Sequence, residues 1–88
     1  MAVLGADVEQ LDQLGRKFDE EAQKIDATIS TITAQVQQAW WKGTDAERFR
    51  NDWEGTGTAQ LRQVIQRLQA ASNDCRKQAQ EQRQVSQS

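Results

Sequence analysis

The sequence lacks proline, histidine and tyrosine altogether, and Cys75 is its only cysteine. Because no proline interrupts the backbone, long helices can run without a forced kink or stop. A single thiol rules out an internal disulfide, and without histidine it makes neither a Cys–His nucleophile pair nor part of a zinc cluster. Acid–base chemistry would have to come from carboxylates and lysines alone. We therefore expect no enzymatic activity, no bound metal and no cofactor.

Long apolar runs and a strong excess of one charge are lacking as well. No stretch approaches the ~20 apolar residues that cross a bilayer, so we expect no membrane span. The net charge of −2 gives no general electrostatic attraction to nucleic acid or anionic lipid. Residues 1–7 have neither the basic nor the long apolar region of a secretory signal peptide, so we do not expect export by the general secretory route.

The residues that are present are typical of long solvated helices. The chain is 36% hydrophobic and contains fifteen glutamines, which favours helix over strand and predicts an all-α fold. Its 88 residues make one small domain, near the lower limit for a self-sufficient core, so we expect oligomerisation. Residues 1–40 carry seven acids and three bases, and residues 41–88 carry six acids and eight bases. The two halves should therefore attract each other weakly.

The first half carries a heptad pattern. One apolar column recurs every seven residues and a second is offset from it by four, as in helices that pack along a seam. The first column is Leu4, Leu11, Phe18, Ile25, Ile32 and Ala39, and the second is Val8, Gly15, Ala22, Ile29 and Val36. The pattern predicts a helix over about residues 7–40, with Asp7 as its N-cap and Gln10 placed to bond back to it.

The heptads stop at a short connection, residues 41–44. There Gly43 can take the left-handed conformation that ends a helix, and Thr44 with Glu47 predicts a capping box for the next one. So short a linker places the two helices side by side and antiparallel. By helical geometry Trp40 extends the apolar stripe into the core, whereas Trp41 points about 100° away toward the rim. There Trp41 either docks another protein or caps the end of the core.

The second half predicts a helix over about residues 45–79 with one broad apolar face. Gly55 and Gly57 leave two alternatives, a continuous helix, which we favour because Gly57 falls in the core column, or a break across residues 54–58. Apolar positions become sparse after residue 79, so we expect the tail, residues 80–88, to fray.

Two polar features of these helices have plain structural interpretations. Arg62, Arg76 and Arg83 recur at multiples of seven, but no aromatic residue lies between them to stack on bases, so we expect a solvated outer stripe and no nucleic-acid site. The consecutive acids of residues 19–21 fan out around a helix and cannot converge on one ion. Cys75 shares the core column and should be buried.

Each predicted helix presents an apolar face wider than one neighbouring helix can bury, so a second hairpin should complete a four-helix bundle. Phe49 and Trp53 are expected to fill the core against Ile32 and Val36. The residues predicted to line the shared core are Leu11, Phe18, Ile25, Ile29, Ile32, Val36, Phe49, Trp53, Leu61, Ile65 and Leu68.

The turn residues Trp41, Lys42 and Gly43 form a Trp-x-Gly motif between two helices at the middle of the chain. With the chain length and the flanking heptads, this motif resembles the WXG family of small ESAT-like proteins. The resemblance covers nearly the whole chain and implies a single hairpin domain over residues 1–88. It also implies dimerisation with an identical or a different WXG-type hairpin, and export of the folded dimer by the type VII secretion machinery, without a cleaved signal peptide.

One part of the family's pattern is missing. Its members combine Trp-x-Gly with a Tyr-x-x-x-Asp/Glu motif after the second helix, but this chain has no tyrosine, and residues 83–88 hold no acid. Two functions therefore follow from the resemblance. The chain is either a secretion substrate or co-secreted partner that borrows the motif from a heterodimeric partner, or an intracellular helical adaptor for a secreted toxin or effector.

Overall fold

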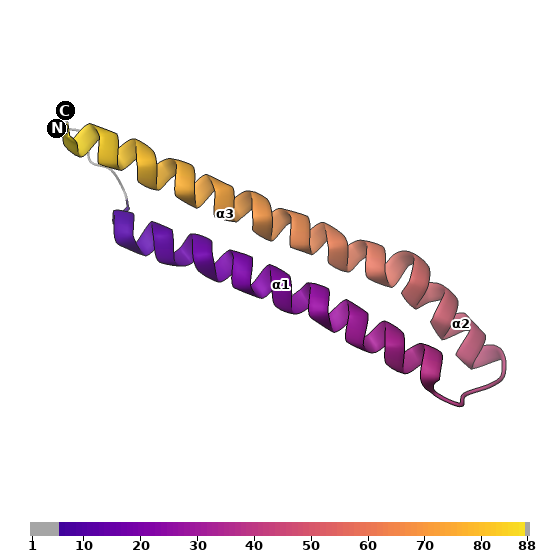
Figure 1. The fold of residues 1–88 in the computed structure, drawn as a ribbon. Coiled ribbons are helices and arrows are strands. Elements are labelled where there is room, and N and C mark those ends of the chain that lie inside the picture. Colours follow the sequence, from indigo (N-terminus) through magenta and orange to yellow (C-terminus); the bar gives the residue numbers. More distant parts are fainter. Residues whose placement is uncertain (1–5, 88) are drawn as a thin grey trace.

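The computed structural model describes residues 6–87, which form two long antiparallel helical arms joined by a turn (Figure 1). The first arm is α1 (Val8–Gln38). The second arm comprises α2 (Thr44–Asp52), a single π-helical turn (Trp53–Gly57) and α3 (Thr58–Gln87). The hairpin measures 66 × 17 × 13 Å. Residues 6–87 contain no strand, and the predicted all-α hairpin is confirmed.

The first arm begins as predicted and ends two residues early. Asp7 has an extended backbone, and its Oδ1 accepts a 3.0 Å hydrogen bond from the backbone N–H of Gln10, so Asp7 is the N-cap. At the other end Ala39 is extended, with φ −65° and ψ 133°. The last helical residue is therefore Gln38, and Trp40 lies outside the helix in which it was predicted.

The turn places Gly43 at the start of the second arm instead of at the end of the first. Gly43 has a φ of 113°, a conformation that favours glycine, and it is the N-cap of α2. Its carbonyl oxygen accepts a 3.1 Å hydrogen bond from the N–H of Glu47. Thr44 is already helical, and no side chain caps this helix. The predicted Thr44–Glu47 capping box is wrong, because Gly43 occupies the cap position.

The second arm is helical without a break, as we favoured, but residues 53–57 form a π-helical turn within it. Trp53, Gly57, Leu61 and Ile65 are each four residues apart, whereas an α-helical stripe alternates steps of three and four. Repeated steps of four are longer than one α-helical turn, and the wider π-helical turn accommodates the extra residue. All four positions are therefore half-buried. A Cβ on Gly57 would lie 3.3 Å from Trp53 Cε3. The glycine thus leaves room for the indole ring.

The predicted frayed tail is wrong up to residue 87, and residue 88 lies outside the described residues. α3 continues to Gln87. Near its end Ala79 is fully buried, Gln82 is half-buried, and Arg83 forms an ion pair with Asp12 of α1. The prediction considered apolar residues alone, and it therefore missed this polar contact between the arms.

Small side chains hold the two arms together. A Cβ on Gly15 would lie 3.4 Å from both the Cys75 Cβ and the Ser72 carbonyl oxygen, so the helices approach closely there. Cys75 is buried, as predicted. The buried positions are Gly15, Ala22, Ile29, Ala46, Ser72, Cys75 and Ala79. This narrow interface leaves little room for large side chains between the arms.

Most of the predicted core residues consequently lie beside the interface. Ile29 alone among them is buried, with 3% of its surface exposed. Ile32 and Phe49 are 36% and 41% exposed in the single hairpin, so their burial in a core shared with a second hairpin stays a prediction. The half-buried ones are Leu11, Phe18, Ile25, Val36, Trp53, Leu61, Ile65 and Leu68.

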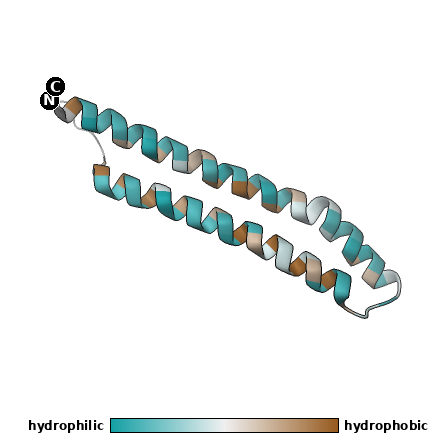
Figure 2. Ribbon diagram, viewed as in Figure 1, coloured by the Kyte–Doolittle hydropathy of each residue, from teal (hydrophilic) through white to brown (hydrophobic). Residues whose placement is uncertain are grey.

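Hydrophobic residues are scattered among hydrophilic ones along both arms, and α3 becomes mainly hydrophilic toward its C-terminal end (Figure 2). Within residues 6–87 no helix is long and apolar enough to cross a membrane.

Candidate protein-recognition surfaces

Trp40 is the most exposed aromatic residue of the hairpin. Its exposed fraction is 87%, against 42% for Trp41. The predicted burial of Trp40 in the core is wrong, and Trp41, which was predicted to face the rim, is exposed but less so than Trp40. The rule of about 100° per residue holds only inside a helix, and α1 ends at Gln38. After Ala39 the chain is no longer helical, and the Trp41 ring packs against Phe49 of α2 while Trp40 stays exposed.

Trp41 belongs to a row of aromatic rings that supports the turn. Its ring centroid lies 5.9 Å from that of Phe49, and Phe49 in turn stacks on Trp53 at 6.4 Å with the two planes only 5° apart. Trp53 Nε1 donates a 2.9 Å hydrogen bond to Thr33 Oγ1 of α1. Aromatic pairs at such distances contribute about 0.5–1.5 kcal/mol each beyond their buried area. Of the two alternatives for Trp41, the structural one therefore describes its surroundings better.

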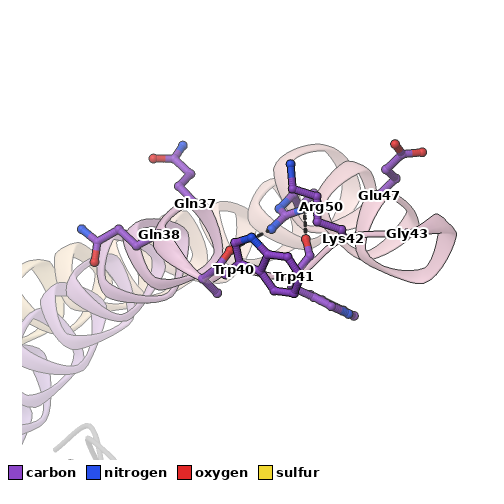
Figure 3. Close-up of a pocket in the computed structure, with 9 residues that line it drawn as sticks. Gln37, Gln38, Trp40, Trp41, Lys42, Gly43, Glu47 and Arg50 are labelled. Carbon is purple, nitrogen blue, oxygen red and sulfur yellow. Dashed lines mark hydrogen bonds between the residues drawn. The ribbon is translucent and has the colours of Figure 1, made fainter.

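Arg50 of α2 fastens the turn to the end of α1 (Figure 3). Its Nη1 donates to the Trp41 carbonyl oxygen at 2.9 Å and its Nη2 to that of Ala39 at 3.3 Å. Nε and Nη2 both donate to the carbonyl oxygen of Val36 at 3.4 Å. Carbonyls at a helix C-terminus have no partner within their helix, and a positive charge there is favourable.

Sequence reasoning missed this role of Arg50. The last turn of α1 contains no basic residue, which is one sign that its carbonyls need donors from elsewhere. However, nothing in the sequence pattern singled out Arg50 among the bases of the second arm. Its assignment depends on the path of the turn, which the heptads do not determine.

An open cleft of about 420 Å³ lies at the same end of the hairpin. All three residues of the predicted recognition motif, Trp41, Lys42 and Gly43, line it, and Lys42 is exposed. The other lining residues are Gln37, Gln38, Ala39, Trp40, Glu47 and Arg50 (Figure 3). Side-chain amides, one ammonium group and an exposed indole are groups that bind another protein's surface.

One side of the hairpin, which we name the polar flank, joins the arms by ion pairs. Asp12 pairs with Arg83, and Asp19 pairs with Arg76. The hydrogen bond from Arg83 lowers the pKa of Asp12, chiefly opposed by desolvation. Arg76 and Arg83 are thus part of the hairpin interface and not merely a solvated stripe. The sequence showed the weak attraction between the halves but not which charges meet.

The opposite side, which we name the apolar flank, carries large hydrophobic residues. In α1 Asp19 lies four residues after the buried Gly15, on one side of the contact between the arms. Leu11 lies four residues before Gly15, on the other side of that contact. In α3 Leu68 likewise lies four residues before the buried Ser72, whereas Arg76 lies four residues after Ser72. The apolar flank consists of Leu11, Leu14, Phe18, Ile25 and Ile32 of α1 and Leu61, Val64 and Leu68 of α3.

Exposure along the apolar flank is considerable. Leu14 is 45% exposed and Val64 is 40% exposed, and the remaining members are half-buried apart from the exposed Ile32. From Leu11 to Ile32 the strip is roughly 30 Å long at 1.5 Å per helical residue. A long strip of partly exposed leucine, isoleucine and phenylalanine is the kind of surface that marks a protein interface.

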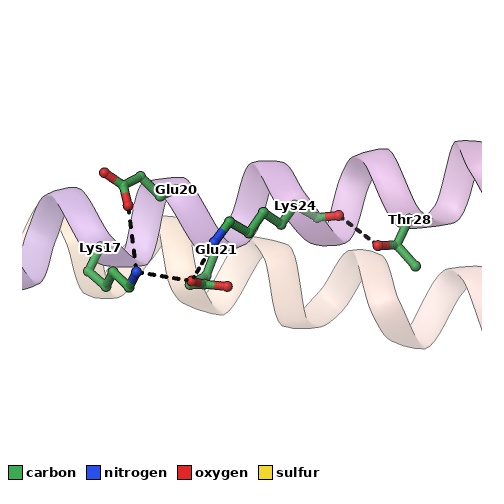
Figure 4. Close-up of polar contacts among 5 residues, drawn as sticks. All are labelled: Lys17, Glu20, Glu21, Lys24 and Thr28. Carbon is green, nitrogen blue, oxygen red and sulfur yellow. Dashed lines mark hydrogen bonds and ion pairs between the residues drawn. The ribbon is translucent and has the colours of Figure 1, made fainter.

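Next to this flank α1 carries a small group of alternating charges. Lys17 lies 3.8 Å from Glu20 and 3.4 Å from Glu21, and Lys24 lies 3.2 Å from Glu21 (Figure 4). Hydrogen bonds from Lys24 and then Lys17 lower the pKa of Glu21. Thr28 also donates a 2.9 Å hydrogen bond to the carbonyl oxygen of Lys24. Such exposed pairs contribute little to stability, because water and salt screen them.

No group of three or more Cys, Asp or Glu side chains placed to hold a metal ion occurs in residues 6–87. Searches of protein-family models, curated proteins and solved structures found no match to this chain.

Proposed function

We propose that this chain is a small ESAT-like protein of WXG type, a substrate or co-secreted partner of a type VII secretion system. It acts by binding other proteins as a dimer of hairpins, with no catalytic site and no cofactor. It is cytoplasmic before export and leaves the cell without a cleaved signal peptide. The support comes from the Trp-x-Gly motif at the tip of a helical hairpin, not from any matching protein.

The exposure of Trp40 beside the Trp41-Lys42-Gly43 motif is the observation that carries the proposal. An indole with 87% of its surface in water adds little to the stability of the hairpin. Buried in another protein, the same side chain can contribute 2 kcal/mol or more as an interface anchor. The cleft that Trp40 lines also offers amide and ammonium groups for hydrogen bonds. We assign docking on the secretion machinery to this end of the hairpin.

The apolar flank supports the second part of the proposal, association with another hairpin. Its leucines, isoleucines and phenylalanine are partly exposed in the single chain, and covering them would bury the large members of the predicted core. A small domain gains stability from such burial at about 25 cal/mol per Å² of apolar area. Whether the covering hairpin is a second copy or a different chain does not affect this argument.

A second candidate function follows from the missing tail motif. Residues 1–88 contain no tyrosine, so the Tyr-x-x-x-Asp/Glu half of the family's export signal does not occur among them. An intracellular adaptor that presents a toxin or other client would use the same two surfaces without leaving the cell. Export with a partner that supplies the motif remains our first proposal, because the Trp-x-Gly half of the signal is present.

Cell fractionation separates the two functions. The tagged chain is expressed in the organism that encodes it, in the parent strain and in a strain with its type VII system inactivated. We expect the chain in the culture filtrate of the parent strain only, with a cytoplasmic marker protein to control for lysis. Retention in the cells of both strains would reject export and favour the adaptor.

A further inference from the structure

The turn that presents Trp40 has few backbone contacts of its own. Within residues 6–87, the backbone hydrogen bonds outside the helices reach this turn only at its ends, from the Ala39 N–H to Gln35 and from the Glu47 N–H to Gly43. Its middle residues therefore depend on side chains for a fixed conformation. Arg50 provides the side-chain hydrogen bonds that the turn receives from the opposite arm.

The hydrogen bonds from Arg50 lie on both sides of Trp40 in the chain. The carbonyl oxygens of Ala39 and Trp41, two residues apart, both accept hydrogen bonds from Arg50. These two bonds hold the backbone on either side of the residue between them. Trp40 is that intermediate residue, and it is the one whose side chain is 87% exposed.

We propose that Arg50 is the positioning residue of the recognition turn, a guanidinium clamp that orders the turn before any partner binds. The proposal rests on the proposed function, in which the turn end docks another protein. A clamp of this kind lowers the entropy that must be lost on binding, because the turn is ordered in advance. Three carbonyl acceptors in a fixed arrangement require the planar fork of arginine, since the ammonium of lysine is a single point of donation.

The structural part of the proposal is tested on the purified chain with Arg50→Met, Arg50→Lys and the matched control Arg48→Met. Arg48 lies on the same helix but pairs only with the nearby Asp45, at 3.7 Å. We measure backbone NMR order parameters of residues 39–43 and the exchange rate of the Ala39 amide proton. In Arg50→Met the order parameters should fall from about 0.85 to below about 0.6, and the amide should exchange roughly tenfold faster.

The other two variants complete this comparison. The order parameters and the amide exchange rate of Arg50→Lys should lie between those of the wild type and Arg50→Met, because lysine can donate to one carbonyl at a time. Arg48→Met should match the wild type in both measurements. Unchanged order and exchange in Arg50→Met would overturn the clamp, whatever the chain's function is.

Export measurements test the functional part, with Trp40→Ala as the reference. If Trp40→Ala reduces export, Arg50→Met should reduce it as well, by roughly tenfold, and Arg50→Lys should restore part of the loss. A reduction by Trp40→Ala alone would overturn the positioning role and leave the docking proposal intact. Normal export of Trp40→Ala would instead refute docking by the turn, and the order parameters would still decide the clamp.

Discussion

Trp53 and Thr33 are joined by a 2.9 Å hydrogen bond from the indole Nε1 to the threonine Oγ1. The bond connects the π-helical turn of the second arm to α1, at a point where both side chains are half-buried. A buried indole N–H needs an acceptor, because desolvating it without one costs free energy. The widened turn and its glycine therefore serve to place Trp53 where Thr33 can accept this bond.

Thr33→Val should destabilise the hairpin by about 1–3 kcal/mol. Valine has nearly the shape of threonine and a similar helix propensity, but it leaves the Trp53 N–H without its acceptor. Urea unfolding followed by circular dichroism measures the change. Thr33→Ser, which keeps the hydroxyl, is the control and should lose much less. Equal stability of the valine variant and the wild type would show that the bond contributes nothing.

Gly55→Ala and Gly57→Ala form a matched pair within the π-helical turn. A Cβ on Gly55 meets nothing within 4 Å, so alanine should stabilise the arm by up to about 1 kcal/mol. A Cβ on Gly57 would lie 3.3 Å from Trp53 Cε3 and 3.4 Å from the Asp52 carbonyl oxygen. Gly57→Ala should therefore melt at a lower temperature than Gly55→Ala. The reverse order would contradict our account of the turn.

Asp12→Asn should reduce stability at neutral pH but not in acid. The hydrogen bond from Arg83 holds the pKa of folded Asp12 below its ordinary value. A carboxyl whose pKa is lower in the folded state stabilises the fold above its unfolded pKa, and this contribution disappears as the pH falls through the folded pKa. The difference in melting temperature should thus shrink below about pH 4. Asp26→Asn is the control. Seven residues before Arg76, where the spacing of Arg76 and Arg83 would place a partner for Asp26, the chain has the uncharged Gln69.

Phe18→Glu should convert the purified protein from a dimer, or a larger assembly, into monomers. Phe18 lies on the apolar flank, and a carboxylate buried there against another hairpin would be unpaired and costly. Light scattering at micromolar concentration gives the mass. Ala27→Glu introduces the same charge at an exposed position outside this flank and should leave the assembly intact. A wild-type protein that is already a stable monomer would refute the dimer.

Heptad spacing and capping chemistry were enough to predict the hairpin and its first N-cap. The columns of α1 are local and periodic, and Asp7 acts within three residues of its own position, so both could be read without knowing the tertiary structure. The length of the turn then required antiparallel arms. What the periodicity could not show was which apolar column would face the other arm, and the narrow column with Gly15 does so.

The turn end was predicted least well, for one physical reason. Its prediction extended helical geometry two residues beyond the point where α1 ends, and it therefore placed Trp40, which is 87% exposed, in the core. The helix end itself depends on Arg50, which caps it from the opposite arm. Contacts between residues distant in sequence also stabilise the end of α3, which fraying arguments based on composition had missed.

Export of Trp40→Ala is the measurement that tests the central claim most directly. The exposed indole contributes little to folding, so the variant should keep the wild-type melting temperature while its amount in the culture filtrate falls at least about tenfold. Trp41→Ala supplies the contrast, since it removes the ring pair with Phe49 and should lower the melting temperature. A folded Trp40→Ala variant that is exported at the wild-type level would contradict docking through this end of the hairpin.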